Sequence, residues 1–348
     1  MRWDNLAAPP DEGAPERAAP ATPPLPLALP GATVRTFDTP GFSGMTFYEV
    51  QAKSIINRVA GNSHVPFEWT INPYRGCSHA CVYCFARNTH TYLDLDAGAD
   101  FDQKVIVKVN AGELLRRELA APRWRGAHIA MGTNVDCYQR AEGRYQLMPQ
   151  IITALRDFAN PFSILTKGTL ILRDLPLLRQ AAEVTRVGVS FSVGFVDERL
   201  WRAVEPGTPS PRRRLDAVRT LSDAGFSVGV LMAPILPGLT DDDESIDATV
   251  AAIAAAGATS VTPIPLHLRT GAREWYAHWL AREFPHLVPR YRELYRAGSY
   301  TPQAYQRELT ARVRIAARRH GLHRGEQGEN RNHPQPPAPP ATEQLTLL

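Results

Sequence analysis

The 348-residue sequence has only four cysteines, and this scarcity excludes a small fold held together by a framework of disulfides. It also lacks any run of about 18 apolar residues, the length that a membrane-spanning helix needs. The N-terminal segment carries no convincing secretory signal, because prolines interrupt its one short apolar stretch. We therefore expect a soluble, cytoplasmic protein with no membrane partner.

A strong excess of one charge is also missing, since the formal net charge is only +4. Arginines nevertheless gather in two places, residues 211–215 and residues 311–325. Solvated helix faces explain such clusters, and contact with nucleic acid is the alternative. Because no aromatic interleaving or known binding module accompanies these arginines, the sequence favours the solvated faces.

Proline is abundant, with 30 residues, and it concentrates at the two ends of the chain. Residues 1–34 and 323–348 cannot bury enough apolar surface to fold, so we expect both to be disordered tails. The composition of the body between them permits a sizeable core. We divide that body into residues 35–268, a barrel domain with an N-terminal extension, and residues 269–322, a helical extension that packs on the barrel.

Short apolar runs alternate with amphipathic stretches through the middle of the chain. The runs typical of strands are residues 67–72, 127–132, 162–167, 186–193, 226–233 and 260–268. The stretches typical of helices are residues 111–119, 147–159, 175–182, 213–225 and 243–257. This alternation predicts an α/β fold with a parallel sheet and helical crossovers. Six strands indicate a partial (β/α)6 barrel of the TIM type, because a complete eightfold barrel usually needs about 250 residues.

Unusual motifs follow the predicted strands at their carboxyl ends, where barrel enzymes carry their active sites. The segment "RGCSHACVYC" follows the first strand, "GTNVDCYQRAE" follows the second, and Lys167 ends the third. The common location of these motifs predicts one functional site on that face of the sheet.

Three of the four cysteines, Cys77, Cys81 and Cys84, stand in a C-x3-C-x2-C pattern. One interpretation is a zinc site, completed by a nearby histidine or by the distant Cys137. Thiol redox chemistry is another. Three thiolates can instead hold three irons of an iron–sulfur cube and leave the fourth iron open for a substrate or cofactor. The spacing alone leaves these interpretations open.

The cysteine pattern, with Tyr83 before its last member, resembles the motif of the radical S-adenosylmethionine (SAM) enzymes. Over roughly residues 45–322, successive segments resemble the branch of that superfamily related to spore photoproduct lyase. These segments are "WTINPYRGCSHACVYCFARNTHTY", "GTNVDCYQRAE", "ILTKGTLILRD", "AVEPGTPSPRRRLDAVRTLSDAG" and "VLMAPILPGLTD". The resemblance implies that Cys77, Cys81 and Cys84 ligate a [4Fe–4S] cluster whose open iron binds SAM. It also implies that Tyr83 lies against the adenine of SAM through its backbone.

The same resemblance assigns further residues to the cofactor. Thr133, Asp136 and Glu142, after the second strand, become candidates for meeting the amino group of SAM. Loop capping is the alternative for the two acidic residues. Lys167 is implied to meet the carboxylate of SAM, and a lysine at a strand end otherwise snorkels or pairs with another anion.

Ser190 and Ser192 alternate with apolar residues along the fourth strand, so both serines face the same side of the sheet. If that side is the barrel interior, their hydroxyls can bond the ribose or carboxylate of SAM. Satisfying backbone groups is the alternative use of such serines.

The sequence departs from its relative after the second strand. In the lyase that the sequence resembles, a cysteine after the second strand returns a hydrogen atom to the product. In this sequence, Gly132 stands at the corresponding place. Cys137, five residues later, is a candidate hydrogen donor, and a buried free cysteine is the alternative. This displacement argues against repair of thymine dimers.

Three other residues carry structural predictions. Asp241 is expected to cap the helix after the fifth strand. Arg87 either stabilises the charge of the cysteine loop or lies on the surface. Trp275 is expected to pack in the core or against a helix.

The function that the sequence favours is that of a radical SAM enzyme. Such an enzyme cleaves SAM reductively, generates a 5′-deoxyadenosyl radical and abstracts hydrogen from a substrate, which the sequence does not identify. It needs an electron donor such as flavodoxin or ferredoxin. Two alternatives stay open, a non-catalytic zinc- or nucleic-acid-binding protein and an iron–sulfur electron carrier.

Overall fold

The computed structural model describes residues 29–60 and 65–322. The predicted C-terminal tail, residues 323–348, lies outside the described residues, as do residues 1–28 of the predicted N-terminal tail. The last residues of the N-terminal tail are ordered, however, because β1 spans Thr33–Arg35 and pairs with β2, Thr46–Val50. Ordered structure therefore begins before residue 35, the boundary that composition predicts.

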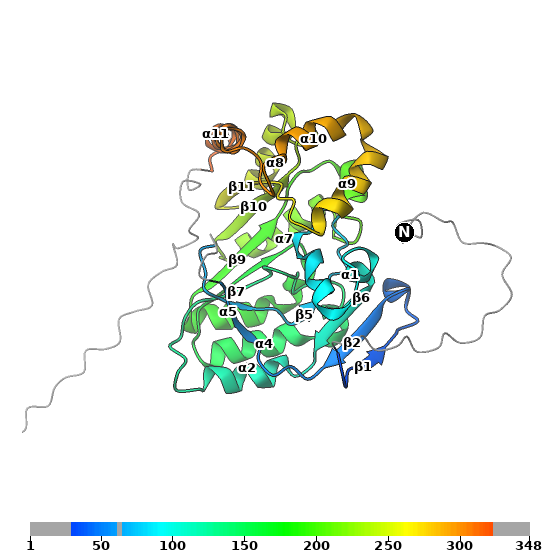
Figure 1. The fold of residues 1–348 in the computed structure, drawn as a ribbon. Coiled ribbons are helices and arrows are strands. Elements are labelled where there is room, and N and C mark those ends of the chain that lie inside the picture. The colour runs from blue at the N-terminus through cyan, green and yellow to red at the C-terminus, as the bar shows by residue number, and fades with distance from the viewer. Residues whose placement is uncertain (1–28, 61–64, 323–348) are drawn as a thin grey trace, which may run out of the picture.

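A seven-stranded sheet forms the centre of the fold, with the strand order β11-β10-β9-β8-β7-β4-β3 (Figure 1). Its six mutually parallel strands overlap the six predicted runs, and β3 (Ile56–Arg58) adds an antiparallel edge. The parallel strands are β4 (Trp69–Ile71), β7 (Ile129–Met131), β8 (Phe162–Thr166), β9 (Val187–Ser192), β10 (Val228–Ile235) and β11 (Ser260–Pro265). The order is linear, so the described sheet is the predicted partial barrel and not a closed ring.

Five long helices make the crossovers between the parallel strands, as predicted. They are α2 (Ala111–Leu119), α4 (Leu147–Asp157), α5 (Leu175–Val184), α7 (Pro211–Asp223) and α8 (Asp243–Ala255). Each has an apolar face that packs on the sheet, which is why the main core draws on all five.

The side chain of Asp242 accepts the backbone N–H of Ser245 at the start of α8, so the prediction of Asp241 as the cap was wrong.

Shorter helices fill the connections. The α-helices among them are α1 (Ala99–Gln103), α3 (Glu142–Tyr145) and α6 (Glu198–Val204), and the 3-10 helices are η2 (Pro40–Phe42), η3 (Phe85–Leu93), η4 (Thr169–Asp174) and η5 (Pro285–Leu287). In the part of the chain that the structure describes, no helix has the length and apolar content needed to cross a bilayer.

A second, four-stranded sheet lies beside the first, with the order β1-β2-β6-β5. It is completed by β6 (Lys104–Lys108) and by β5 (Tyr74–Arg75), which immediately precedes the cysteine loop. The pairing of β5 with β6 is antiparallel, and the backbone N–H of Cys77 then bonds the carbonyl of Phe101. This sheet, which the sequence did not predict, therefore anchors the start of the cysteine loop.

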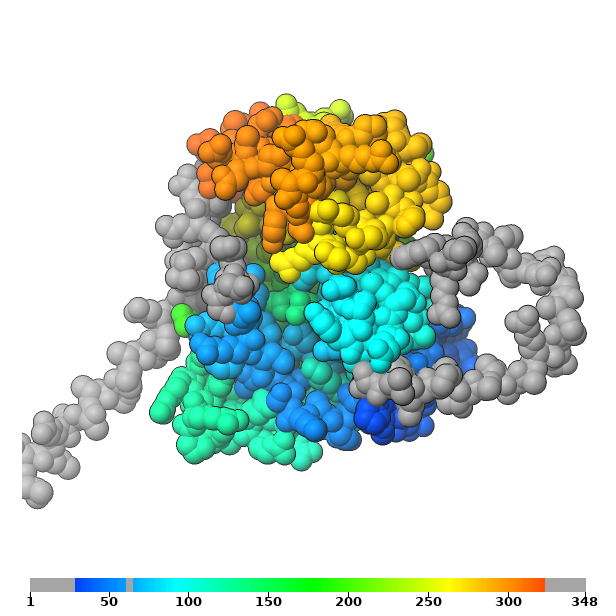
Figure 2. Space-filling view, viewed as in Figure 1, coloured from blue at the N-terminus to red at the C-terminus, as the bar shows by residue number. Residues whose placement is uncertain are grey.

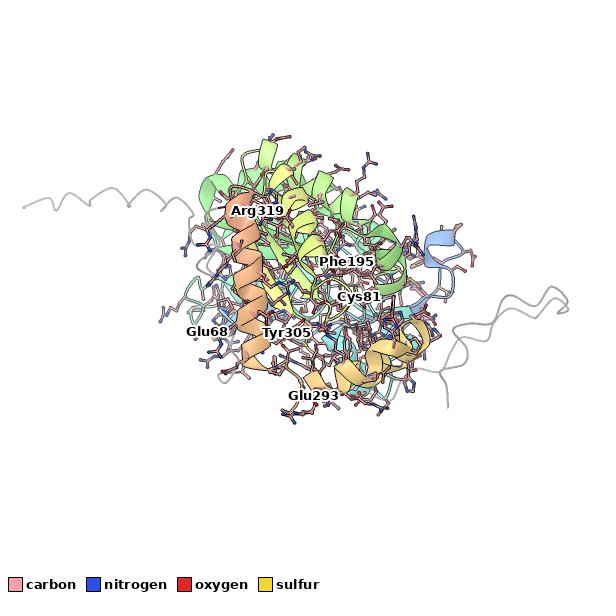
Figure 3. All side chains as sticks on the ribbon, turned by 90° about the horizontal axis from the view of Figure 1, so that it is seen from above. Glu68, Cys81, Phe195, Glu293, Tyr305 and Arg319 are labelled. Carbon is pink, nitrogen blue, oxygen red and sulfur yellow. The ribbon has the colours of Figure 1, made fainter. Side chains whose placement is uncertain are left out.

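Three helices follow the last strand, α9 (Ala272–Glu283), α10 (Val288–Leu294) and α11 (Gln303–Arg319). In Figures 1 and 2 they form the upper layer of the molecule, above the cyan segment that contains η3. α11 packs on α8 and on the edge strand β11, and α9 packs on η3. Figure 3, viewed from above, shows Tyr305 and Arg319 along the length of α11.

A second apolar cluster lies between these helices and the cysteine loop. It includes Cys81 and Tyr83 from the loop, Phe195 from the segment after β9, and Tyr276 and Trp279 from α9. Figure 3 labels two of its members, Cys81 and Phe195. The C-terminal helices are thus part of the packing around the cysteines.

Candidate cluster and cofactor site

The cysteine loop joins β5 to η3 and lies against the carboxyl ends of the parallel strands. Its backbone turns tightly, because Ala80 N bonds the carbonyl of Cys77 and Cys84 N bonds the carbonyl of Cys81. Ala80 has a φ of 52°, in the left-handed region that a residue with a side chain rarely adopts. These turns bring three thiols together on one short segment.

All three thiols lie in a poorly hydrated environment. Burial raises the pKa of Cys77, of Cys81 and of Cys84. The negative charge of Asp136 adds to the effect on Cys77, and that of Glu205 adds to the effect on Cys81. Bound metal ions would favour the thiolate form of these side chains.

Arg87 supports the loop from beneath and is fully buried, at 0% exposure. Its Nη2 donates to the carbonyl of Cys81 at 3.0 Å and to both carboxylate oxygens of Asp102 at 2.9 and 3.0 Å. Burial raises the pKa of Asp102 to about 6, against the lowering effect of Arg87. Of the two predicted alternatives for Arg87, a surface position is wrong, because the side chain is fully buried and donates to the backbone of the cysteine loop.

Asp136 connects the loop after β7 with the end of β8. Its Oδ1 accepts the hydroxyl of Thr166 at 2.6 Å, and its Oδ2 accepts the backbone N–H of Lys167 at 2.7 Å. His79, in the cysteine loop, places its Nδ1 3.4 Å from Oδ2. Burial lowers the pKa of His79, although Asp136 opposes the shift. These contacts beside the cysteines favour the capping alternative for Asp136.

Lys167 points from the end of β8 toward the cysteine loop. Its Nζ donates to Ser192 Oγ at 2.7 Å, lies 3.9 Å from Glu205 Oε1 and sits 5.7 Å from the ring centroid of Tyr83. Ser192 Oγ in turn donates to the carbonyl of Ala233 at 2.8 Å. Since Ser190 and Ser192 alternate with buried residues of β9, Ser190 shares this face of the sheet.

Two residues that sequence reasoning missed complete this group. Glu205 and Arg214 form an ion pair at 2.5 Å with both side chains about 1% exposed. Glu205 also accepts the hydroxyl of Tyr83, and Arg214 Nη1 donates to the carbonyl of Ser192 at 2.8 Å. The sequence offered one signal, an isolated acidic residue between apolar Val204 and a Pro-Gly turn, but nothing in its spacing pointed to the cysteines.

The sequence around this site matches that of a known protein family. The sequence model of the Radical SAM superfamily matches residues 71–249, which include the cysteine loop and most of the parallel strands. The chain is a member of the radical SAM superfamily. It is accordingly a radical SAM enzyme, and the cofactors of this family are a [4Fe–4S] cluster and SAM.

The relatives of this radical SAM protein extend beyond the matched region. An uncharacterized protein of Mycobacterium tuberculosis is 50% identical over 320 residues, which cover 91% of this chain and 92% of the relative. An uncharacterized protein of Methanocaldococcus jannaschii is 29% identical over 209 residues, or 60% of this chain and 74% of the relative.

Among solved structures, spore photoproduct lyase complexed with dinucleoside spore photoproduct superimposes with a TM-score of 0.57. The match covers 78% of this chain and 79% of the lyase at 16% sequence identity. A lyase variant with bound AdoMet and the same dinucleoside gives a TM-score of 0.57 at 17% identity, covering 78% of each chain. At these identities the likeness shows a common fold.

The cysteine loop of this radical SAM protein fits an iron–sulfur cube. The three thiolates that a cube with one open iron needs stand on one short segment, at Cys77, Cys81 and Cys84. Ser78 Oγ in the loop and Thr133 Oγ1 after β7 are buried with no hydrogen-bond partner among the described residues. Such atoms suit a site that a polar ligand fills.

Glu142 has a different environment from the other candidates. Its carboxylate accepts the backbone N–H groups of Leu147 and Met148 at the start of α4, each at 3.0 Å. The same carboxylate binds the hydroxyl of Tyr74 and Arg173, at 2.5 and 2.7 Å. These contacts favour the capping alternative, since the carboxylate already has four partners away from Lys167.

Gly132 and Cys137 differ sharply in what surrounds them. Gly132 has a φ of +82°, and a Cβ added there would overlap the carbonyl oxygen of Leu165. No cysteine fits that position without movement of β8. Cys137 is 0% exposed and belongs to the main apolar core, and burial raises the pKa of its thiol well above the usual value. These surroundings favour the alternative of a buried free cysteine.

Proposed function

We propose that Cys77, Cys81 and Cys84 hold a [4Fe–4S] cluster with one open iron, where SAM is cleaved reductively to act on a substrate at the mouth of the partial barrel. When bound and reduced, the cluster and SAM together supply a 5′-deoxyadenosyl radical that abstracts hydrogen. The observation that carries the proposal is the placement of this loop against Lys167 and Ser192, at the carboxyl edge of six parallel strands.

The loose pairing of Lys167 supports a carboxylate-binding role. Its Nζ lies 3.9 Å from Glu205 Oε1, and Glu205 is already held by Arg214 at 2.5 Å. An anion in direct contact with Lys167 would be favourable in so poorly hydrated a place, because it would offset the cost of burying the ammonium group. We assign the carboxylate of SAM to Lys167, with Ser192 and Ser190 on the same face as further donors.

The amino group of SAM would meet the loop after β7. Thr133 offers a buried hydroxyl oxygen, and Asp136 offers a carboxylate beside His79 of the cysteine loop. Tyr83 lies between two cluster ligands in sequence, so its backbone is available to the adenine while its hydroxyl is held by Glu205. Asp136 keeps its capping contacts in this arrangement and contributes mainly negative charge.

The division of the chain follows the same proposal. We assign the chemistry to residues 35–268, the barrel domain, and a covering role to residues 269–322, whose helix α9 packs on η3 and whose Trp275 lies over Arg87. A flavodoxin or ferredoxin would deliver the electron that reductive cleavage of SAM requires.

The test is anaerobic reconstitution of the full chain with iron and sulfide, reduction with dithionite, and measurement of 5′-deoxyadenosine formed from SAM. We expect the product from the wild type and none from Cys81→Ala. A loaded, reducible cluster that gives no 5′-deoxyadenosine would support the electron-carrier alternative. A protein that takes up zinc and never a cluster would refute the proposal in favour of a zinc-binding protein.

A further inference from the structure

The segment Val204–Gly207 runs alongside the cysteine loop and contacts it at three successive places. Val82 N donates to the carbonyl of Val204 at 3.0 Å, and Gly207 N donates to the carbonyl of His79 at 3.1 Å. Between these two backbone bonds, the hydroxyl of Tyr83 donates to the carboxylate of Glu205. This segment, which we call the brace, therefore follows the loop on both sides of Cys81, from His79 to Tyr83.

The brace approaches so closely that one of its residues must be glycine. A Cβ added at Gly207 would overlap the carbonyl oxygen of Ser78 and come within 2.9 Å of the backbone carbon of His79. The backbone of the cysteine loop and the backbone of the brace are thus in direct contact. Movement of one requires movement of the other.

Glu205 links the brace to the rest of the site. Its Oε2 is 2.5 Å from Arg214 Nη2, and the other arm of Arg214 bonds the carbonyl of Ser192, the residue whose hydroxyl holds Lys167. Burial alone would raise the pKa of Glu205, but Arg214 and Lys167 together lower it, so the carboxylate is ionised. One carboxylate therefore contacts the cysteine loop and the lysine at the end of β8.

We propose that Glu205 is a positioning residue, which through Tyr83 and Lys167 fixes the separation between the cluster loop and the group that binds the carboxylate of SAM. This inference rests on the proposed function. Without the charge of Glu205, Lys167 and Arg214 would repel each other across a buried space, and Tyr83 would lose the partner of its hydroxyl. The distance between the open iron and Lys167 would then no longer suit the simultaneous binding of SAM by both.

The test compares Glu205→Gln with the wild type in the reconstituted full chain. We expect unchanged iron content, a SAM affinity at least tenfold weaker by equilibrium dialysis, and loss of the change that SAM causes in the electron paramagnetic resonance spectrum of the reduced cluster. The matched control is Asp241→Asn. Asp241 is also buried and accepts from one arginine, Arg290, and from one tyrosine, Tyr305. It should keep the affinity and the spectral change of the wild type.

A double-mutant cycle separates positioning from simple destabilisation. If Glu205 acts through Lys167, Glu205→Gln should weaken SAM binding far less in a Lys167→Met background than in the wild type. Wild-type affinity in a loaded Glu205→Gln protein, or full additivity in the cycle, would overturn the inference. A wild type that loads no cluster or binds no SAM would instead overturn the proposed function. If Glu205→Gln does not fold, Tyr83→Phe and Glu205→Asp replace it, with an intermediate loss expected for both.

Discussion

The guanidinium of Arg87 lies over the indole ring of Trp275, with 4.5 Å between the guanidinium carbon and the ring centroid. Trp275 belongs to α9, whereas Arg87 follows the last cysteine and donates to the carbonyl of Cys81. A cation held against an aromatic ring in a dry environment contributes about 2 kcal/mol. This contact makes the C-terminal helices part of the support of the cysteine loop.

Replacing Arg87 by Met should destabilise the protein strongly. The change leaves Asp102 buried without its partner and frees the carbonyl of Cys81, so we expect a loss of about 3–5 kcal/mol in the free energy of unfolding. Anaerobic urea denaturation measures it, and iron content should fall in parallel. The control is Arg282→Met, whose exposed pair with Glu283 should contribute less than about 1 kcal/mol. Similar losses in the two variants would contradict the role given to Arg87.

His90 should make stability depend on pH. Burial lowers its pKa from 6.5 to about 4, so the unfolded chain binds a proton between these values that the folded chain does not. Stability from this group is therefore present above pH 6.5 and is lost as the pH falls toward 4. Between pH 7.5 and 5.5 we expect a loss of about 1 kcal/mol that is absent in His90→Gln. Equal pH dependence in both proteins, measured by urea denaturation, would refute this assignment.

Cys137→Ala should retain 5′-deoxyadenosine formation. The side chain is enclosed in the main core, so the expected effect is a loss of about 1–2 kcal/mol in stability, from a small cavity. The measurements are thermal unfolding and 5′-deoxyadenosine yield. If Cys137→Ala still formed 5′-deoxyadenosine but no longer converted an identified substrate, the result would instead support Cys137 as the hydrogen donor.

Gly132→Ala should be among the most damaging small substitutions in the protein. It combines a positive φ with overlap against the carbonyl of Leu165. Gly126→Ala is the matched control, because Gly126 has a φ of +68° but no heavy atom within 4 Å of an added Cβ. We expect about 1 kcal/mol of destabilisation at Gly126 and at least about 3 kcal/mol at Gly132. Denaturant unfolding measures the loss in the free energy of unfolding for the two variants. Equal losses would show that the backbone of β8 moves at little energetic cost.

The sequence predicted the six parallel strands because each is a short apolar run, and five of them follow an amphipathic stretch typical of a helix. It did not predict the second sheet, whose pairing joins β2 to β6 and β6 to the two-residue strand β5. Such pairing depends on contacts between segments that are distant in the sequence. A strand of two residues is also too short to show an alternation of apolar and polar residues.

The site shows the same limit. The spacing of Cys77, Cys81 and Cys84 carries a chemical signature by itself, and Lys167 was noticeable at the end of an apolar strand. Glu205 and Arg214 carry no such signature, since a single acid and one arginine within a basic run are common on surfaces. Only their burial, at 0% and 1% exposure, distinguishes them, and burial of that kind arises when the fold forms.

The backbone at Gly132 also sets a boundary on what this scaffold can acquire by single substitutions. Every amino acid except glycine brings a carbon atom into the space of the neighbouring strand's carbonyl. New chemistry at the first turn after β7 would therefore need a prior rearrangement of β8.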